Sequence, residues 1–438
     1  MKILIHVRTW NKEFYCRLAN MAFENPDITM IADFRGLADV WSGDYLYDKS
    51  YDVSNEDFEE QKDDIITRCR FLRSIPRQKA EELARRFWNG TEKLFQEQKY
   101  DVVISPVADC YTMDILERMA EKYQAEYFAL VTSFVRGYSR FTKQGELFDA
   151  RRPVTDAEID NVIGMLVNDD YKVTFSLNKE KKQFDTVKFY MRRRLVDKLY
   201  FPYKKHKDKD PWNYHYNTLS FQGGRYADYS IKNAEKYYKK ISEADIQKKS
   251  VYVPLHYSPE ATVDYWCDNK KWAYYEQSVI AFIKASDLEV SFVVKEHPAM
   301  YGKRNINFYK ELTSMENVQL IHPYENSNQL LRELWNVMVY TGSVGVEALL
   351  RGKKVFTVTD NYYSRCSNNI VKTDRIKASD LIEEKLEHDN QKFMRQLLSG
   401  MFQGSSTAGK DINKSEIEKI AAEMRRIYVN RVTDKKNR

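Results

Sequence analysis

Cysteine is scarce and scattered in this sequence. Only five cysteines occur among 438 residues, and no two of them stand close together in the chain; they are Cys16, Cys69, Cys110, Cys267 and Cys366. This distribution excludes a zinc site built from paired cysteines and a disulfide framework, because both depend on recurrent cysteine spacings. It favours a reducing compartment, so we expect a cytoplasmic protein.

Long apolar runs are missing as well. The N-terminal stretch becomes polar after Val7, which is too short for a signal peptide. No other run reaches the roughly 20 apolar residues that a membrane-spanning helix needs. Any membrane association is therefore expected to be peripheral, at the inner face of the plasma membrane.

Charge of one sign is not in large excess. The chain has 70 Lys and Arg against 64 Asp and Glu, a net charge of +6 that suits anionic ligands and lipid surfaces. No arginine-rich tail or recognised nucleic-acid motif accompanies this charge, so nucleic acid is not an expected partner. No Asp-x-Asp motif stands at a predicted strand end. We therefore expect no metal and no cofactor.

The composition is that of a globular protein, and the chain is long enough for two domains. Hydrophobic residues make up 43% and aromatic residues 14% of the chain, which suffices for packed cores. The 438 residues exceed the length of one ordinary domain. Apolar runs and helical periodicity alternate in residues 1–150, with predicted strands at 2–7, 28–33, 100–105 and 127–131 and helices at 11–24, 76–98 and 111–123. This alternation predicts a Rossmann-like domain with a parallel sheet.

The alternation returns in residues 246–410. Strands are predicted at 251–255, 288–294, 318–321, 337–340 and 354–358, with helices at 270–285, 305–314, 327–335 and 343–350. Five strands with four crossovers indicate a second doubly wound sheet. The sequence therefore predicts an α/β protein with two Rossmann-like doubly wound domains.

Two further segments do not follow the alternation. Residues 151–245 are predicted to form a helical insertion around a basic, aromatic stretch at 178–215. Its charge suits a solvated helix face, an acidic lipid surface or an anionic acceptor. Residues 411–438 form a predicted amphipathic helix and tail, which packs on the first domain or lies on a membrane.

Candidate ligand-binding residues follow three predicted strands. Ligands of open parallel sheets bind beyond the carboxyl ends of the strands. Lys295 and His297 stand at such an end, where the histidine can donate to a phosphate or simply be satisfied in a turn. Ser258 and Glu260 lie in the loop after another strand, or begin the next helix, and His256 opens the same loop.

The third strand end is the most specific of the three. Thr341, Gly342 and Ser343 lead from a strand into a short helix, where small residues let a phosphate approach backbone N–H groups. Glu347 lies one turn further on the face of Ser343 and could accept hydrogen bonds from ribose hydroxyls. A capping box would need its acid at position 346, where valine stands, so capping does not explain Glu347. A helix-surface carboxylate is the alternative.

Taken together, the segments PLHYSPEAT, VKEHP and TGSVGVEALLRGKKVFTV resemble, in order and spacing, the capsule polysaccharide biosynthesis family, which includes Kdo-transferase-like glycosyltransferases of the GT-B type. The resemblance covers residues 250–360. It implies two domains facing a cleft, with the C-terminal domain binding a nucleotide-sugar such as a CMP-sugar. His297 would contact the donor phosphate, with Lys295, Ser343 and Glu347 in the same site. Family members often carry Gln-Pro where this chain has Ser258-Pro259.

The resemblance extends to a segment of the first domain. Residues 104–130 resemble the strand, loop and helix that face the acceptor, a glycan or lipid-linked chain. Asp109 in that loop is a candidate base for the acceptor hydroxyl, although aspartate is also a favoured N-cap. His6 is an alternative base, and Arg136 and Arg140 are candidate contacts to an anionic acceptor or belong to a solvated loop.

Three other functions suit the same architecture. A nucleotide-sugar epimerase would bind its substrate in the same site, and a polyol-phosphate transferase would use a related donor. A non-catalytic partner would bind the glycan for another enzyme. A sugar transfer by direct displacement, without a metal, is the function that the sequence favours.

Overall fold

The computed structural model describes residues 1–146, 151–168, 171, 231–405 and 413–436, together with the single residues 192, 195, 199, 203 and 206. These residues divide into two compact units. Unit 1 holds residues 1–146, 151–153, 398–405 and 413–436, and unit 2 holds residues 154–168 and 231–397. Most of the basic stretch 178–215 lies outside the described residues. Within the described ranges, no helix is both long and apolar enough to cross a bilayer.

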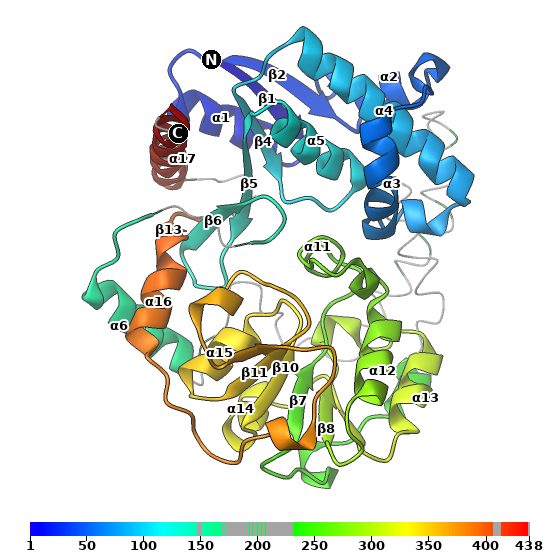
Figure 1. Ribbon diagram of the computed structural model, residues 1–438, viewed down its shortest axis with the longest axis vertical. Helices are drawn as coiled ribbons and strands as arrows, with labels where there is room; N and C mark the ends of the chain where they lie inside the picture. The colour runs from blue at the N-terminus through cyan, green and yellow to red at the C-terminus, as the bar shows by residue number, and fades with distance from the viewer. Residues whose placement is uncertain are drawn as a thin grey trace. The chain divides into compact units, whose positions relative to one another are not determined.

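Unit 1 is built on one seven-stranded sheet in the order β13-β6-β5-β4-β1-β2-β3 (Figure 1). The strands are β1 (Lys2–Val7), β2 (Asp27–Ala32), β3 (Val40–Trp41), β4 (Val102–Pro106), β5 (Glu126–Thr132), β6 (Tyr138–Thr142) and β13 (Phe402–Gln403). Strands β1 to β5 pair in parallel, whereas β6 and β13 add an antiparallel edge. The four predicted strands are confirmed; the short β3 and the antiparallel edge carry no periodic signal in the sequence.

Helices cover both faces of this sheet. They are α1 (Lys12–Ala22), α2 (Ser42–Leu46), α3 (Glu56–Arg68), α4 (Arg77–Glu97), α5 (Tyr111–Lys122) and α17 (Lys414–Lys436), with 3₁₀ turns at Lys49–Tyr51 and Leu72–Ser74. Helix α17 packs against α1, where the rings of Phe23 and Tyr428 lie 5.3 Å apart (Figure 1). Both helices share an apolar core with β1, β4 and β5. The prediction that the last helix packs on the first domain is confirmed.

Unit 2 is built on a six-stranded sheet in the order β12-β11-β10-β7-β8-β9. Its strands are β7 (Val251–Pro254), β8 (Phe292–Lys295), β9 (Val318–Ile321), β10 (Asn336–Val339), β11 (Lys354–Thr357) and β12 (Ile370–Lys372). Every pair in it is parallel. All five predicted strands are confirmed, and β12 adds a sixth at the edge beside β11. Strand β7 lies at the centre, between β10 and β8, as the doubly wound fold requires.

The helices of unit 2 follow the predicted crossovers. They are α6 (Asp156–Val167), α10 (Ile231–Glu235), α11 (Ala261–Asp264), α12 (Tyr275–Ala285), α13 (Ile306–Thr313), α14 (Ser327–Glu333) and α15 (Val344–Leu350), while α16 (Asn390–Ser399) leads out of the unit. Short 3₁₀ turns lie at Ile241–Glu243, Lys270–Ala273, Pro298–Met300, Ser364–Cys366 and Ala378–Asp380. Within the predicted helical insertion 151–245, α10 ends at Glu235, and the chain at Lys239 then bridges to Ile321 at the end of β9.

Candidate functional site

Three predicted ligand-binding loops lie at one edge of the unit 2 sheet. They follow β10, β7 and β8, which are adjacent and parallel in that order. The register pairs Pro254 at the end of β7 with Lys295 at the end of β8. Because the carboxyl ends of parallel strands meet at one edge, the segments that begin at His256, Glu296 and Thr341 are brought together.

His256 connects two of these loops. Its ring nitrogen Nε2 accepts a hydrogen bond of 3.4 Å from the backbone N–H of Thr341. A methyl group added to Gly342 would lie 3.3 Å from the same ring, so glycine permits this close approach. The backbone N–H of His256 donates to the hydroxyl of Tyr275 at 2.9 Å. Ser258, two residues further along, is also buried. The position of His256 at a strand end was the only signal for it in the sequence.

His297 keeps one ring nitrogen available. Its Nδ1 accepts a hydrogen bond of 3.1 Å from the backbone N–H of Ala299, so the neutral ring carries its proton on Nε2. Among the described residues, Nε2 has no hydrogen-bond partner. Burial, followed by the positive charges of Arg304, Lys295 and Lys303, lowers the pKa of His297 to about 3. The ring is therefore a neutral N–H donor at physiological pH. The alternative, a histidine whose hydrogen bonds are satisfied within a turn, applies to Nδ1, which accepts from Ala299, but not to Nε2.

Ser343 and Glu347 occupy one face of helix α15. Ser343 begins the helix without a side-chain capping bond, and its backbone oxygen accepts from the N–H of Glu347 at 3.3 Å. The Glu347 carboxylate makes no hydrogen bond or ion pair with any residue that the structure describes. Burial raises the pKa of Glu347 to about 7, and Arg351 offsets only part of this effect. A half-buried carboxyl group that lacks a partner is open to a ligand.

Three other predicted residues already have partners inside the protein. The Lys295 ammonium is buried and donates to the backbone oxygen of Pro323 at 2.9 Å. The Thr341 hydroxyl donates to the backbone oxygen of Thr262 at 3.1 Å, and the Thr262 hydroxyl donates to Glu260 at 2.8 Å. Lys295 can thus supply charge to a ligand, while Thr341 and Glu260 shape the loops.

A buried ion pair lies behind the two histidines. Arg304 and Glu296 are both fully buried and share two hydrogen bonds, of 2.8 Å from Nε and 3.1 Å from Nη2. The hydroxyl of Tyr309 donates to the same carboxylate at 2.7 Å. Arg304 also donates to the backbone oxygen of His256. Sequence reasoning missed Arg304, because nothing in its local pattern distinguishes it from a surface arginine.

Asp109 in unit 1 is held by an arginine. Arg8 donates to it through both terminal nitrogens, at 2.9 Å from Nη1 to Oδ2 and through Nη2 to Oδ1. Burial alone would raise the pKa of Asp109, but the charge and hydrogen bonds of Arg8 outweigh it and lower the pKa to about 2. The N-cap of α5 is Cys110 rather than Asp109. The alternative role of Asp109 as a helix cap is therefore wrong.

The other predicted groups of unit 1 differ in their accessibility. His6 is only 1% exposed, with Nε2 at 3.4 Å from Asp33, so an acceptor cannot reach it directly. Arg140 is 3% exposed and donates to the backbone oxygens of Gly145 and Glu146, so its charge is used within that loop. Arg136 is exposed at the turn before β6.

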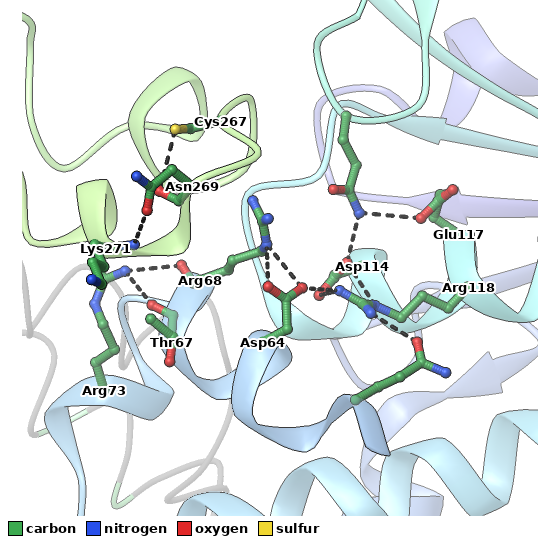
Figure 2. Close-up of polar contacts among 12 residues, drawn as sticks. Asp64, Thr67, Arg68, Arg73, Asp114, Glu117, Arg118, Cys267, Asn269 and Lys271 are labelled. Carbon is green, nitrogen blue, oxygen red and sulfur yellow. Dashed lines mark hydrogen bonds and ion pairs between the residues drawn. The ribbon is translucent and has the colours of Figure 1, made fainter. Parts of the chain in front are cut away.

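A charged cluster in unit 1 was not anticipated. Arg118 lies between Asp64 and Asp114, at 2.6 Å and 3.1 Å (Figure 2). Gln144 donates to both Asp114 and Glu117. Asp64, Glu117, Arg118 and Gln144 help to line a cavity of about 720 Å³. Burial and the nearby Asp114 raise the pKa of Glu117 to about 7. These carboxylates accept hydrogen bonds from Arg118 and Gln144, which they share, and this sharing indicates a structural network.

The whole chain is similar in fold to several solved structures. No curated protein matches it significantly. Among solved structures, it is similar to the β-Kdo 2,7-transferase of KpsC from Thermosulfurimonas dismutans, at 12% identity and a TM-score of 0.37 over 98% of this chain and 99% of that one. The β-Kdo 2,4-transferase of the same protein matches at 13% identity and a TM-score of 0.34, over 74% and 87%. A UDP-GlcNAc 2-epimerase from Methanocaldococcus jannaschii matches at 12% identity and a TM-score of 0.25, over 99% of both chains.

A protein-family comparison gives the clearest result. The model of the family described as capsule polysaccharide biosynthesis protein matches residues 108–367, which is more than half of the chain. The match begins at the loop of Asp109 and includes the loops of His256 and His297 and the whole of helix α15. The chain belongs to the capsule polysaccharide biosynthesis protein family.

Proposed function

We propose that this protein is a glycosyltransferase that moves a sugar from a nucleotide donor onto a growing bacterial surface polysaccharide or lipid-linked acceptor. A CMP-sugar such as CMP-Kdo is the favoured donor. The proposal places the reaction in the cytoplasm, at the inner face of the plasma membrane. It is supported by membership of the capsule polysaccharide biosynthesis protein family and by the hydrogen-bonding side chains that converge at one edge of the unit 2 sheet.

The observation that carries the proposal is the available N–H of His297. Its Nε2 has no partner among the described residues and remains a neutral donor, so it can bind a phosphate oxygen of the donor. Ser343 offers a hydroxyl at the start of α15, and the buried ammonium of Lys295 adds positive charge. Glu347, whose carboxylate has no partner in the part of the chain that the structure describes, would accept hydrogen bonds from the ribose hydroxyls.

The reaction that fits these groups is a direct displacement. The acceptor hydroxyl attacks the anomeric carbon, the bond from that carbon to the phosphate oxygen breaks, and the nucleotide leaves with the electron pair. Asp109 would receive the hydroxyl proton. Because Arg8 keeps Asp109 ionised, it can always accept a hydrogen bond from the hydroxyl, but it retains a proton poorly. Proton transfer to Asp109 is therefore expected to come late, as the new bond forms. No metal or cofactor enters this scheme.

A thermal-shift screen against CMP, CDP, UDP and GDP tests the donor site. A ligand present at one hundred times its Kd stabilises the folded protein by about 2.7 kcal/mol, so a cytidine nucleotide should raise the Tm clearly. His297→Asn should abolish that rise, whereas the control His388→Asn should preserve it, because His388 contacts Asn390, which binds the opposite end of α15 at Leu350. Stabilisation by a uridine or guanosine nucleotide alone would overturn the proposed donor class.

Product analysis separates the neighbouring reactions. A transferase releases free nucleotide only when an acceptor is added, while an epimerase changes the donor sugar without any acceptor. A polyol-phosphate transferase leaves phosphorus in the product. A non-catalytic partner would keep its cellular function after loss of Asp109 and His297, which a complementation test can show.

A further inference from the structure

We propose that Arg304 is a positioning residue of the phosphate site, which fixes the loops of His256 and His297 and places a permanent positive charge behind both rings. The inference rests on the proposed function, because it assumes that an anion binds beside these rings. The Arg304 side chain itself is fully buried. It acts through the two histidines.

Arg304 holds two loops together through direct hydrogen bonds. One guanidinium group binds the carboxylate of Glu296 and the backbone oxygen of His256. The same carboxylate accepts the backbone N–H of His297 at 2.6 Å. The loops after β7 and β8 are thereby joined through a single side chain. Lysine could not reproduce this arrangement, because it lacks the planar fork that binds two acceptors at fixed angles.

Arg304 also contributes to the charge around the two rings. The charged and titratable groups that face the rings or Arg304 are Lys295 and Glu296 at the end of β8, Tyr257 after β7, Lys303 and Arg304 before α13, Tyr309 on α13, Tyr275 and Glu276 on α12, and Tyr340 after β10. Three cations thus stand against two carboxylates. Burial and these cations keep His256 and His297 neutral, since the pKa of each is lowered to about 3. The site can therefore attract an anion with fixed charges and bind it with neutral N–H donors.

Removal of Arg304 would reverse this balance. Glu296 would remain as a buried carboxylate without its main partner, and it would favour protonation of the adjacent His297. The histidine would then titrate nearer its ordinary value of about 6.5. Anion binding would weaken at high pH, where the carboxylate dominates, and would recover at low pH, where the histidine gains charge. A purely structural defect would weaken binding equally at both pH values.

The test is isothermal titration with CMP or CDP at pH 5.5 and pH 8.0. The phosphate group of the free ligand titrates identically in every experiment. The ratio of each variant's affinity to the affinity of the parent therefore reports only the effect of the substitution on the protein. Arg304→Met is expected to lose about tenfold or more in affinity at pH 8.0 and to regain most of it at pH 5.5, as one unit of pKa linkage implies. Arg304→Lys should lose less, with a ratio that does not change with pH. The exposed control Arg375→Met should match the parent.

Two additional measurements keep the inference decidable. Lys303→Met removes a half-buried cation that also faces His297, so it should show a smaller loss of the same pH dependence even if Arg304→Met does not fold. NMR titration of the histidine ring protons needs no ligand: the parent rings of His256 and His297 should stay neutral between pH 5.5 and 8.0. Titration of either ring in the parent, or an equal loss at both pH values in Arg304→Met, would overturn the inference. Absence of nucleotide binding by the parent, with neutral rings, would instead overturn the proposed function.

Discussion

Glu347→Gln should increase stability while it weakens nucleotide binding. Burial raises the pKa of Glu347 from its ordinary value of 4.5 to about 7. Each unit of pKa corresponds to about 1.4 kcal/mol, so the charged form costs at most roughly 3 kcal/mol in the folded state. The side chain is only half-buried, and solvent screening reduces this to an expected 1 to 2 kcal/mol, roughly. Glutamine is uncharged at every pH and does not carry the cost.

The sign of the effect depends on pH in a defined way. Between about pH 4.5 and 7 the folded state binds more protons at Glu347 than the unfolded state, so this group reduces stability as the pH rises. The cost is complete above pH 7 and small below pH 5. Glu347→Gln should therefore be nearly neutral at pH 5 and stabilising by about 1 to 2 kcal/mol at pH 8.

Urea unfolding at pH 5 and pH 8 measures this difference directly. The exposed Glu316 of the same unit provides a matched control, because Glu316→Gln should change stability by the same small amount at both pH values. Nucleotide affinity of Glu347→Gln should fall several-fold at pH 8, since an amide is a poorer acceptor for ribose hydroxyls than a carboxylate. A variant that is destabilised equally at both pH values would refute the reasoning.

Three further predictions follow from named contacts. Gly342→Ala places a methyl group 3.3 Å from the ring of His256, so chemical denaturation should show a loss of about 1 kcal/mol in the free energy of unfolding. Nucleotide affinity should also fall; unchanged affinity would show that the contact between Gly342 and the His256 ring does not belong to the binding site. Asp109→Asn should lower kcat by about 10²- to 10⁴-fold and leave the Kd for nucleotide unchanged, and a kcat near that of the parent would exclude Asp109 as the base. Glu117→Gln should stabilise the protein at pH 8 but not at pH 5 in urea unfolding, because burial raises the pKa of Glu117 to about 7; an equal change at both pH values would contradict this.

Helices and strands of the two sheets were predictable because their signals are local. The apolar runs of β1, β4 and β7 to β11 are short and bounded by polar loops, and these strands were all confirmed. The rule that ligands bind beyond the carboxyl ends of parallel strands then located the loops of His256, His297 and Ser343 at one edge. The short β3 was missed because two residues establish no period, and the antiparallel β6 was missed because its sequence, YSRFT, contains no apolar run.

The state of individual side chains was not predictable, because it depends on partners far away in the chain. Asp109 meets Arg8 across 101 positions, and this contact lowers its pKa. Arg140 was a candidate acceptor contact until the fold placed it under the loop that ends at Glu146. Such contacts leave no periodic trace in the sequence.

The α/β class, the two doubly wound sheets and the family resemblance could be predicted from the sequence, because each rests on runs of neighbouring residues. The fold was needed to show that His256 and His297 are neutral, that Arg304 is buried beside them and that the Glu347 carboxylate has no partner among the described residues. The physical reason is that protonation and hydrogen bonding respond to burial and to charges within a few ångströms. Those neighbours are brought together by folding, from elements that are separate in the chain.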